Sequence, residues 1–351
     1  MADQGVYVHV PFCATRCDYC AFATWSDRLE LIGDYFAALV RQAADAATDM
    51  APVTSVFVGG GTPNMVPARL LTEVLDQLPL EDGAEVTVEC NPDVVTDEQM
   101  WSYAAHGVER ISLGVQSMVP SVLASLGRTH DPSNVYRAVE AIRAAGIERL
   151  NLDIIYGAAG ESLADWHQTL DETVALAPDH VSAYALTVEA GTALADDPAR
   201  HPDDDDQADK YRLADEVLTG AGLENYEISN WARPGQECRH NLLYWTQGNY
   251  VGLGCAAHSH VDGRRSWSIR TPEGFVEAIE SGESVEAGSE TLGEEERRVE
   301  ALQLAVRLAG GVEAAVIPDE VRHLVQTGDD GRARLTLEGR LLANEVAVRL
   351  N

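Results

Sequence analysis

Six short runs rich in Val, Ile and Leu recur through the first 190 residues, and they restrict the fold more than any other feature of this chain. The runs span residues 6–10, 55–58, 85–90, 110–115, 149–156 and 181–188. Strands that alternate with helices form a parallel sheet covered by helices, and strands this apolar are buried on both faces. The pattern therefore predicts an α/β fold, either an open three-layer sheet or a barrel.

The segments between these runs carry helical period and helix-boundary signals. Leu31, Tyr35 and Leu39 return at the spacing of one helix face. Helix starts are predicted where a capping residue is followed by a suitable partner or by proline: Thr96 with Gln99, Asp131 with Pro132, and Ser162 with Asp165.

Three cysteines, Cys13, Cys17 and Cys20, follow the first run directly. Thiolates prefer iron-sulfur clusters, zinc or cuprous ions, and a cubane cluster normally takes four of them. Three ligands leave one coordination position open, which is typical of a reactive metal site. A zinc site and three unrelated apolar positions are the weaker alternatives. The scattered Cys90 and Cys238, like Cys255, are predicted to be core residues rather than disulfide partners.

Charge and hydropathy exclude several classes of function. The 351 residues include 57 acidic and 25 basic side chains, so the formal net charge is −32. This balance argues against binding to nucleic acid or anionic lipid. The chain has no apolar run of membrane-spanning length and no recognisable signal peptide. We therefore expect a cytoplasmic protein.

Polar and glycine residues cluster where the predicted strands end. Barrel active sites gather at the carboxyl ends of the strands. Consecutive glycines let the backbone approach a ligand closely and offer amide hydrogens to a carboxylate. Each polar residue taken alone could be a structural hydrogen-bonding group, but their shared position favours ligand binding. The residues are Gly59, Gly60, Gly61, Thr62, Glu89, Gln116, Arg128 and Asp153.

The second half of the chain has a different pattern. Acidic residues 203–206 predict a solvated loop before a helix at 207–218, with a metal site as a weak alternative. His240 lies among aromatic residues, and it could ligate heme iron or be a satisfied core histidine. The last 80 residues predict a small α+β unit, with helices at 294–308, 318–325 and 338–350 and a strand at 332–337. We expect three units, at 1–190, 191–270 and 271–351.

The cysteine spacing C-x-x-x-C-x-x-C resembles that of the radical S-adenosylmethionine (SAM) superfamily. The order of further motifs is similar to that of its coproporphyrinogen III oxidase-like family: 7–13, 59–63, 114–117, 151–157 and 240–245. This resemblance implies a partial (β/α)6 barrel with a small C-terminal α+β domain. It implies that Cys13, Cys17 and Cys20 ligate a 4Fe-4S cluster. It also implies that Tyr7, Gly60, Gly61, Thr62 and Glu89 contact SAM, and that Tyr19, Gln116, Arg128 and Asp153 lie at a second SAM position.

Two features favour the heme chaperone branch of this family. The oxidase has a fourth cysteine two residues beyond the third, where this chain has Phe22, and a longer segment before the motif. The sequence from His240 to Trp245 is similar to the H-N-x-x-Y-W heme motif of the chaperones, which implies that His240 binds heme. The branch implies a protein that binds a cluster, SAM and heme and passes heme to acceptor proteins, respiratory ones among them, with a homodimer as one possible state. The alternative is an enzyme, an oxygen-independent coproporphyrinogen III oxidase that catalyses an oxidative decarboxylation. The segment 192–209 and the C-terminal unit are shorter than is usual for the family.

Overall fold

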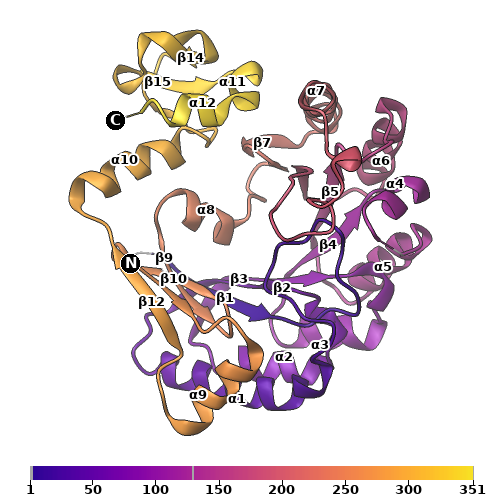
Figure 1. Ribbon diagram of the computed structural model, residues 1–351, viewed down its shortest axis with the longest axis vertical. Coiled ribbons are helices and arrows are strands. Elements are labelled where there is room, and N and C mark those ends of the chain that lie inside the picture. The colour runs from indigo at the N-terminus through magenta and orange to yellow at the C-terminus, as the bar shows by residue number, and fades with distance from the viewer. Residues whose placement is uncertain (1–2, 129, 351) are drawn as a thin grey trace.

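The computed structural model describes residues 3–128 and 130–350, and its main body is one curved sheet (Figure 1). Six neighbouring strands run parallel in chain order, which confirms the predicted α/β fold of strands alternating with helices. They are β1 (Gln4–Val10), β2 (Val53–Gly60), β3 (Leu80–Cys90), β4 (Arg110–Gln116), β5 (Arg149–Tyr156) and β6 (His180–Ala185). The last predicted run extends to residue 188, whereas β6 ends at Ala185. The carboxyl ends of all six strands meet at one edge of the sheet, which places the predicted site there.

Later segments of the chain extend this sheet at both sides, giving 12 strands among the described residues. Beyond β6 lie β8 (Asn230–Ala232) and β7 (Glu224–Glu227). Beyond β1 lie β9 (Asn249–Leu253), β10 (His258–Val261), β11 (Arg264–Ser268) and β12 (Glu286–Thr291). β9 pairs parallel to β1 with Gly252 opposite Tyr7, and the other added pairs are antiparallel. The first strand is therefore an interior strand.

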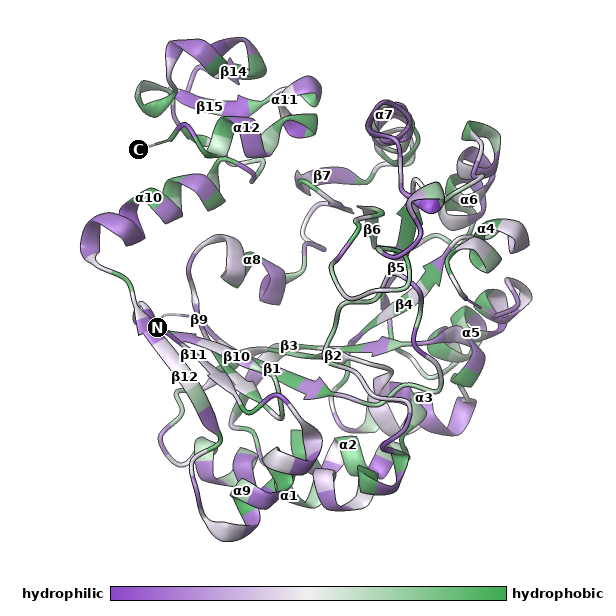
Figure 2. Cartoon of the chain, viewed as in Figure 1, coloured by the Kyte–Doolittle hydropathy of each residue, from purple (hydrophilic) through white to green (hydrophobic). Residues whose placement is uncertain are grey.

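Helices cover the outer face of the curved sheet, and their apolar sides face the strands (Figures 1 and 2). α1 buries Tyr35, Phe36 and Leu39, as its sequence period predicts. The outer helices are α1 (Ile32–Ala47), α2 (Ala68–Leu75), α3 (Asp97–Ala105), α4 (Pro120–Ser125), α5 (Ser133–Ala144), α6 (Leu163–Ala175) and α7 (Asp204–Gly220). In Figure 1, α8 (Arg239–Trp245) lies on the opposite, inner side of the sheet.

The predicted helix starts are found, with two differences in detail. α5 begins one residue later than predicted, with Pro132 rather than Asp131 at its N-cap, and Asp131 accepts the Ser133 amide at 2.8 Å. Ser162 and Asp165 form the expected reciprocal capping box. Thr96 accepts the amide of Gln99, but the Gln99 side chain donates to the Asn64 carbonyl at 2.8 Å instead of turning back to the cap. Only half of that predicted box is present, because a tertiary hydrogen bond competes for the glutamine.

A second, smaller hydrophobic cluster lies in the C-terminal part of the chain. α10 (Glu294–Ala305) leads into β13 (Val312–Glu313), β14 (Val325–Thr327), β15 (Arg332–Leu335), α11 (Leu337–Leu341) and α12 (Ala343–Ala347). The predicted helix at 338–350 is two short helices that meet at Leu342, and the segment 319–324 is a 3-10 helix. The division into three units remains a prediction. α9 (Pro272–Ser281) places Phe275 in the core of the main body, whereas the second cluster is built from residues 302–350.

Across residues 3–128 and 130–350, no helix combines the length and the apolar character needed to cross a bilayer.

Candidate cluster and cofactor site

The cysteine loop leaves the carboxyl end of β1 and is closed at its base by backbone hydrogen bonds. The Trp25 amide donates to the Pro11 carbonyl at 2.7 Å, and the Cys13 amide donates to the Trp25 carbonyl at 3.1 Å. Within the loop, the Cys20 amide donates to the Cys17 carbonyl at 3.2 Å. All three thiols are partly buried. These bonds hold the three cysteines on one short loop above the strand ends.

The chemistry around the thiols suits an iron-sulfur cluster. Burial raises the pKa of Cys13 and of Cys20, and the nearby thiols add to this effect. Thr62 donates its hydroxyl to the Cys13 sulfur at 3.7 Å, and Arg128 donates to the Cys17 sulfur at 3.5 Å. Hydrogen bonds and positive charge at the sulfurs stabilise thiolate ligands. In the described part of the chain, no three His, Cys, Asp or Glu side chains are arranged as a metal site.

The glycine segment after β2 differs from the prediction in one respect. Its amides are already used within the protein: Gly60 donates to Glu89 at 3.1 Å, Gly61 to the Val10 carbonyl at 2.8 Å, and Thr62 to the Phe12 carbonyl at 2.8 Å. A Cβ atom at Gly61 would lie 2.4 Å from the Phe12 oxygen. The glycines therefore allow the end of β2 to pack against the start of the cysteine loop, and the three amides are not free for a ligand carboxylate.

Two partly buried carboxylates lie on β3 and β5, the strands on either side of β4. Burial, with the charge of Asp153, raises the pKa of Glu89 to about 8, and the Gly60 amide opposes that rise. Burial also raises the pKa of Asp153, which accepts hydrogen bonds from Ser112 at 2.7 Å and Asn151 at 2.8 Å. A cationic or hydrogen-bond-donating ligand beside this pair would offset the cost of burying charge.

Gln116, Arg128 and Tyr19 close the other side of the site. Arg128 donates to the Gly114 carbonyl at 3.2 Å, and a Cβ atom at Gly114 would lie within 3.1 Å of the Gln116 and Arg128 side chains. Gln116 has a φ of 61°, which aims it out of the regular strand. Burial raises the pKa of Tyr19 beyond its ordinary value, and the Arg128 charge opposes this. The structure thus gathers the sequence-predicted residues of β1 to β5 at one edge.

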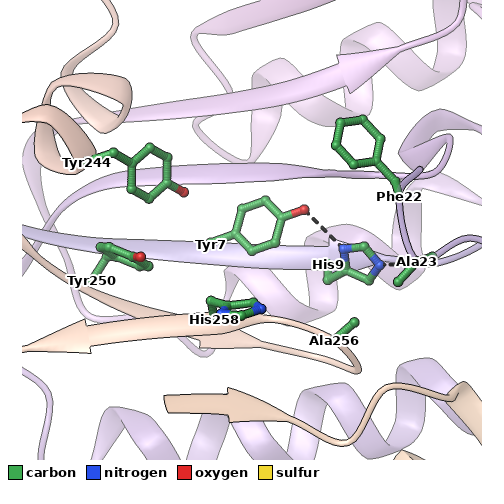
Figure 3. Close-up of a pocket in the computed structure, with 8 residues that line it drawn as sticks. All are labelled: Tyr7, His9, Phe22, Ala23, Tyr244, Tyr250, Ala256 and His258. Atoms are coloured by element: carbon green, nitrogen blue, oxygen red, sulfur yellow. Dashed lines mark hydrogen bonds between the residues drawn. The ribbon is translucent and has the colours of Figure 1, made fainter. Parts of the chain in front are cut away.

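A cavity of about 280 Å³ opens between β1, β9 and the end of the cysteine loop (Figure 3). The Tyr7 hydroxyl lies 3.0 Å from His9 Nδ1, and His9 Nε2 lies 2.9 Å from the Ala23 carbonyl. Burial, then the charge of Glu89, raises the pKa of Tyr7 well above its usual value. The full lining is Tyr7, His9, Phe22, Ala23, Tyr244, Tyr250, Ala256 and His258.

His240 is in a different position from that of an open ligand. It is a buried residue of the first turn of α8, where its Nδ1 lies 3.0 Å from the Ser55 hydroxyl and its Nε2 lies 2.9 Å from the Tyr244 hydroxyl. Burial lowers the pKa of His240 to about 4, with Glu85 opposing the shift. Both ring nitrogens have partners, so the alternative of a satisfied core histidine describes its contacts. Its predicted role as a heme ligand remains a prediction.

Sequence reasoning did not single out three residues of this region. His9 and His258 line the cavity, and Glu85 anchors α8 by accepting the His240 amide at 3.2 Å. His9 stands two residues after Tyr7 on the same strand, so the period of two could have indicated it. His258 reaches the site only through the pairing of β9 with β1, which no local pattern signals.

Comparison with known proteins places this geometry in a family. A family model described as "Radical SAM superfamily" matches residues 7–173. The heme chaperone HemW of Mycobacterium tuberculosis is 41% identical over 97% of this chain and 93% of its own length. The chain belongs to the HemW family of heme chaperones. HemW of Escherichia coli is 37% identical, over 81% of this chain and 79% of the relative. These relatives confirm the heme chaperone branch that the sequence motifs predicted.

Coproporphyrinogen III oxidase (HemN) from Escherichia coli matches the fold with a TM-score of 0.87, covering 99% of this chain and 90% of that structure. Its sequence is only 19% identical, so it is evidence for the fold alone. The match confirms the predicted partial barrel. A 4Fe-4S cluster and SAM are the cofactors of the radical SAM superfamily, as expected from the cysteine motif.

Proposed function

We propose that this protein binds heme beside a 4Fe-4S cluster and SAM and passes the heme to acceptor proteins, respiratory ones among them. The observation that carries the proposal is the 41% identity to a heme chaperone over 97% of the chain. The aromatic cavity beside the cysteine loop supports it, because porphyrin rings pack well on aromatic side chains. A cytoplasmic location and a homodimer belong to the same proposal.

The cofactor assignments follow from the residues at the strand ends. Cys13, Cys17 and Cys20 would hold the cluster, with Thr62 and Arg128 donating to two of the sulfurs. Glu89 would accept hydrogen bonds from SAM beside Tyr7 and residues 60–62, and Tyr19, Gln116, Arg128 and Asp153 would line a second SAM position. A reduced cluster with SAM bound supplies one-electron chemistry, and the protein supplies orientation and exclusion of water.

The second candidate is oxygen-independent coproporphyrinogen III oxidase activity. The similarity of this fold to that of HemN is the observation that favours oxidase activity. Phe22, which stands where the resemblance places the oxidase's fourth cysteine, is exposed and cannot ligate iron. We therefore rank oxidase activity second.

The test is an anaerobic titration of the cluster-reconstituted protein with heme, followed in the Soret region. We expect saturable binding at one heme per chain, and transfer of the bound heme to a heme-free acceptor protein on mixing. SAM-dependent release of carbon dioxide from coproporphyrinogen III is measured in parallel. Absence of saturable heme binding contradicts the chaperone proposal, and release of carbon dioxide at catalytic rates would favour the oxidase.

A further inference from the structure

A chain of buried hydrogen bonds crosses three strands and ends at Asp153. Asn151 stands two residues before Asp153 on β5, and its side-chain nitrogen lies 2.8 Å from the Asp153 carboxylate. His180 is opposite Asn151 on β6, and its Nδ1 lies 2.7 Å from the Asn151 side-chain oxygen. The His180 Nε2 lies 2.8 Å from the hydroxyl of Tyr226 on β7. Asn151, His180 and Tyr226 are all buried, so water does not compete for these bonds.

The imidazole of His180 is neutral in this setting. Burial lowers its pKa well below the usual value, and the charges of Arg110 and Arg149 lower it further. A neutral imidazole has one donor nitrogen and one acceptor nitrogen, so two arrangements of the chain are chemically consistent. In the first, Nδ1 donates to the Asn151 oxygen and Nε2 accepts from Tyr226. In the second, the Asn151 amide is reversed and its oxygen faces Asp153.

The other contacts of Asn151 and Asp153 select the first arrangement. The Ser112 hydroxyl donates to Asp153 at 2.7 Å, and it accepts from the Asn151 amide at 2.7 Å. A reversed amide would place its oxygen against the carboxylate and would leave Ser112 without a donor, and both changes are costly in a buried site. The Ser182 hydroxyl, 3.3 Å from the Asn151 oxygen, supports the same orientation.

Neutral donors of this kind are what supports the charge of Asp153. Burial raises the pKa of this carboxyl, and hydrogen bonds from neutral side chains, Ser112 and Asn151 among them, oppose the rise ahead of the Arg110 charge. Asp153 forms no ion pair with a Lys or Arg side chain of residues 3–128 and 130–350. Loss of the Asn151 donor would therefore favour the protonated form of Asp153.

We propose that His180 is a positioning residue for the SAM position at Asp153. Its Nδ1–H fixes the Asn151 amide, and the amide in turn directs its NH2 group to the Asp153 carboxylate and holds that carboxylate ready to accept hydrogen bonds from the ligand. This inference rests on the proposed function, because it takes Asp153 as part of a SAM site.

The experiment separates the two nitrogens of the His180 ring. His180→Asn keeps an amide N–H near the place of Nδ1, whereas His180→Gln places its amide near Nε2 and loses the donor to Asn151. Tyr226→Phe is the matched control, because it removes a buried hydrogen bond of the same ring at the other nitrogen. Asp153→Ala tests the SAM position itself. All variants are studied as the full-length, cluster-reconstituted protein, and anaerobic equilibrium dialysis gives the number of SAM molecules bound and their dissociation constants.

We expect His180→Gln to weaken SAM binding at this position by about tenfold, and by more at lower pH, where Asp153 protonates more readily. His180→Asn and Tyr226→Phe should stay within about threefold of the wild type, although urea unfolding should show a loss of stability in both. Wild-type affinity in His180→Gln, or an equal loss of affinity in Tyr226→Phe, would overturn the positioning role.

Asp153→Ala distinguishes this failure from failure of the proposed SAM site. If Asp153→Ala weakens SAM binding while His180→Gln does not, only the positioning role of His180 is wrong. If Asp153→Ala binds as much SAM as the wild type and as tightly, the proposed SAM position at Asp153 is wrong, and the role of His180 fails with it.

Discussion

Glu89 shows how burial tunes a single residue of the site. Its carboxylate lies at the end of β3 and accepts the Gly60 amide at 3.1 Å. It also interacts electrostatically with the Asp153 carboxylate. Burial and that charge raise its pKa from 4.5 to about 8. At neutral pH and without a ligand, this carboxyl therefore tends to hold a proton.

The raised pKa of Glu89 predicts a pH-dependent stability in the cofactor-free protein. The folded state keeps a proton that the unfolded chain releases, so this contribution is present below about pH 4.5 and is lost as pH rises through about 8. The free energy of unfolding should fall in this window by about 1.4 kcal/mol per pH unit from this group. Glu89→Gln, which mimics the protonated form, should remove that slope in urea unfolding measured across the window.

The control for this experiment is Glu73→Gln, because Glu73 is an exposed carboxylate on α2 that pairs with Arg69. Its unfolding free energy should follow the wild type at every pH. Parallel curves for Glu89→Gln and the wild type would contradict the raised pKa.

At the scale of elements, one buried carboxylate fastens α8 to the sheet. Glu85 on β3 is fully buried, accepts the His240 amide at 3.2 Å and the Cys238 thiol at 3.5 Å, and pairs with Arg149 at 3.1 Å. Arg110, also buried, approaches the same carboxylate at 4.0 Å. A negative charge at a helix N-terminus also complements the helix dipole. The orientation of His240 and Tyr244 therefore depends on Glu85.

Removing this charge should loosen α8 and destabilise the fold. Glu85→Gln leaves two arginines without their buried counter-charge, which typically costs about 3 kcal/mol or more. Glu109→Gln is the matched control, because Glu109 also pairs with Arg149, at 2.8 Å, but is 40% exposed, so its loss should cost less than about 1 kcal/mol. Urea unfolding measures both. Equal destabilisation by the two variants would show that Glu85 has no special anchoring role.

At the scale of the whole molecule, the C-terminal part of the chain is attached to the main body by polar contacts and by Leu337 and Leu341 of α11, which pack against the main core. Arg340 on α11 makes two parallel hydrogen bonds to Asp215 on α7, at 2.7 and 2.8 Å. The Arg340 guanidinium also lies over the Tyr211 ring, 5.6 Å from its centroid. Bidentate, partly buried pairs of this kind are stronger than ordinary surface ion pairs.

Breaking this contact should free the C-terminal cluster without unfolding the barrel. Asp215→Asn should make the segment around α10 more sensitive to limited proteolysis by about threefold or more, because about 1 kcal/mol of docking energy is lost. Glu216→Gln on the same helix is the control, because Glu216 is an exposed carboxylate of α7. Cleavage is followed by mass spectrometry. Unchanged cleavage in Asp215→Asn would mean that apolar contacts alone hold the cluster in place.

The sequence by itself determined the alternation of strands and helices, the outer helix faces and the cysteine loop. These features are local: strand composition, helical period, capping residues and thiol spacing act within a few residues of one another. For the same reason the strand-end positions of Glu89 and Gln116 could be predicted, because parallel neighbours end at the same edge.

Only the tertiary structure decided how distant segments meet at the site. β9 pairs with β1 across more than 240 residues, from Val6 to Val251, and this brings His258 beside Tyr7. The glycine amides of residues 60 and 61 find partners in Glu89 and Val10. Both nitrogens of His240 are satisfied by Ser55 and Tyr244. Burial and long-range hydrogen bonding depend on which surfaces pack together in the folded chain. The spacing of residues along the sequence does not specify these contacts.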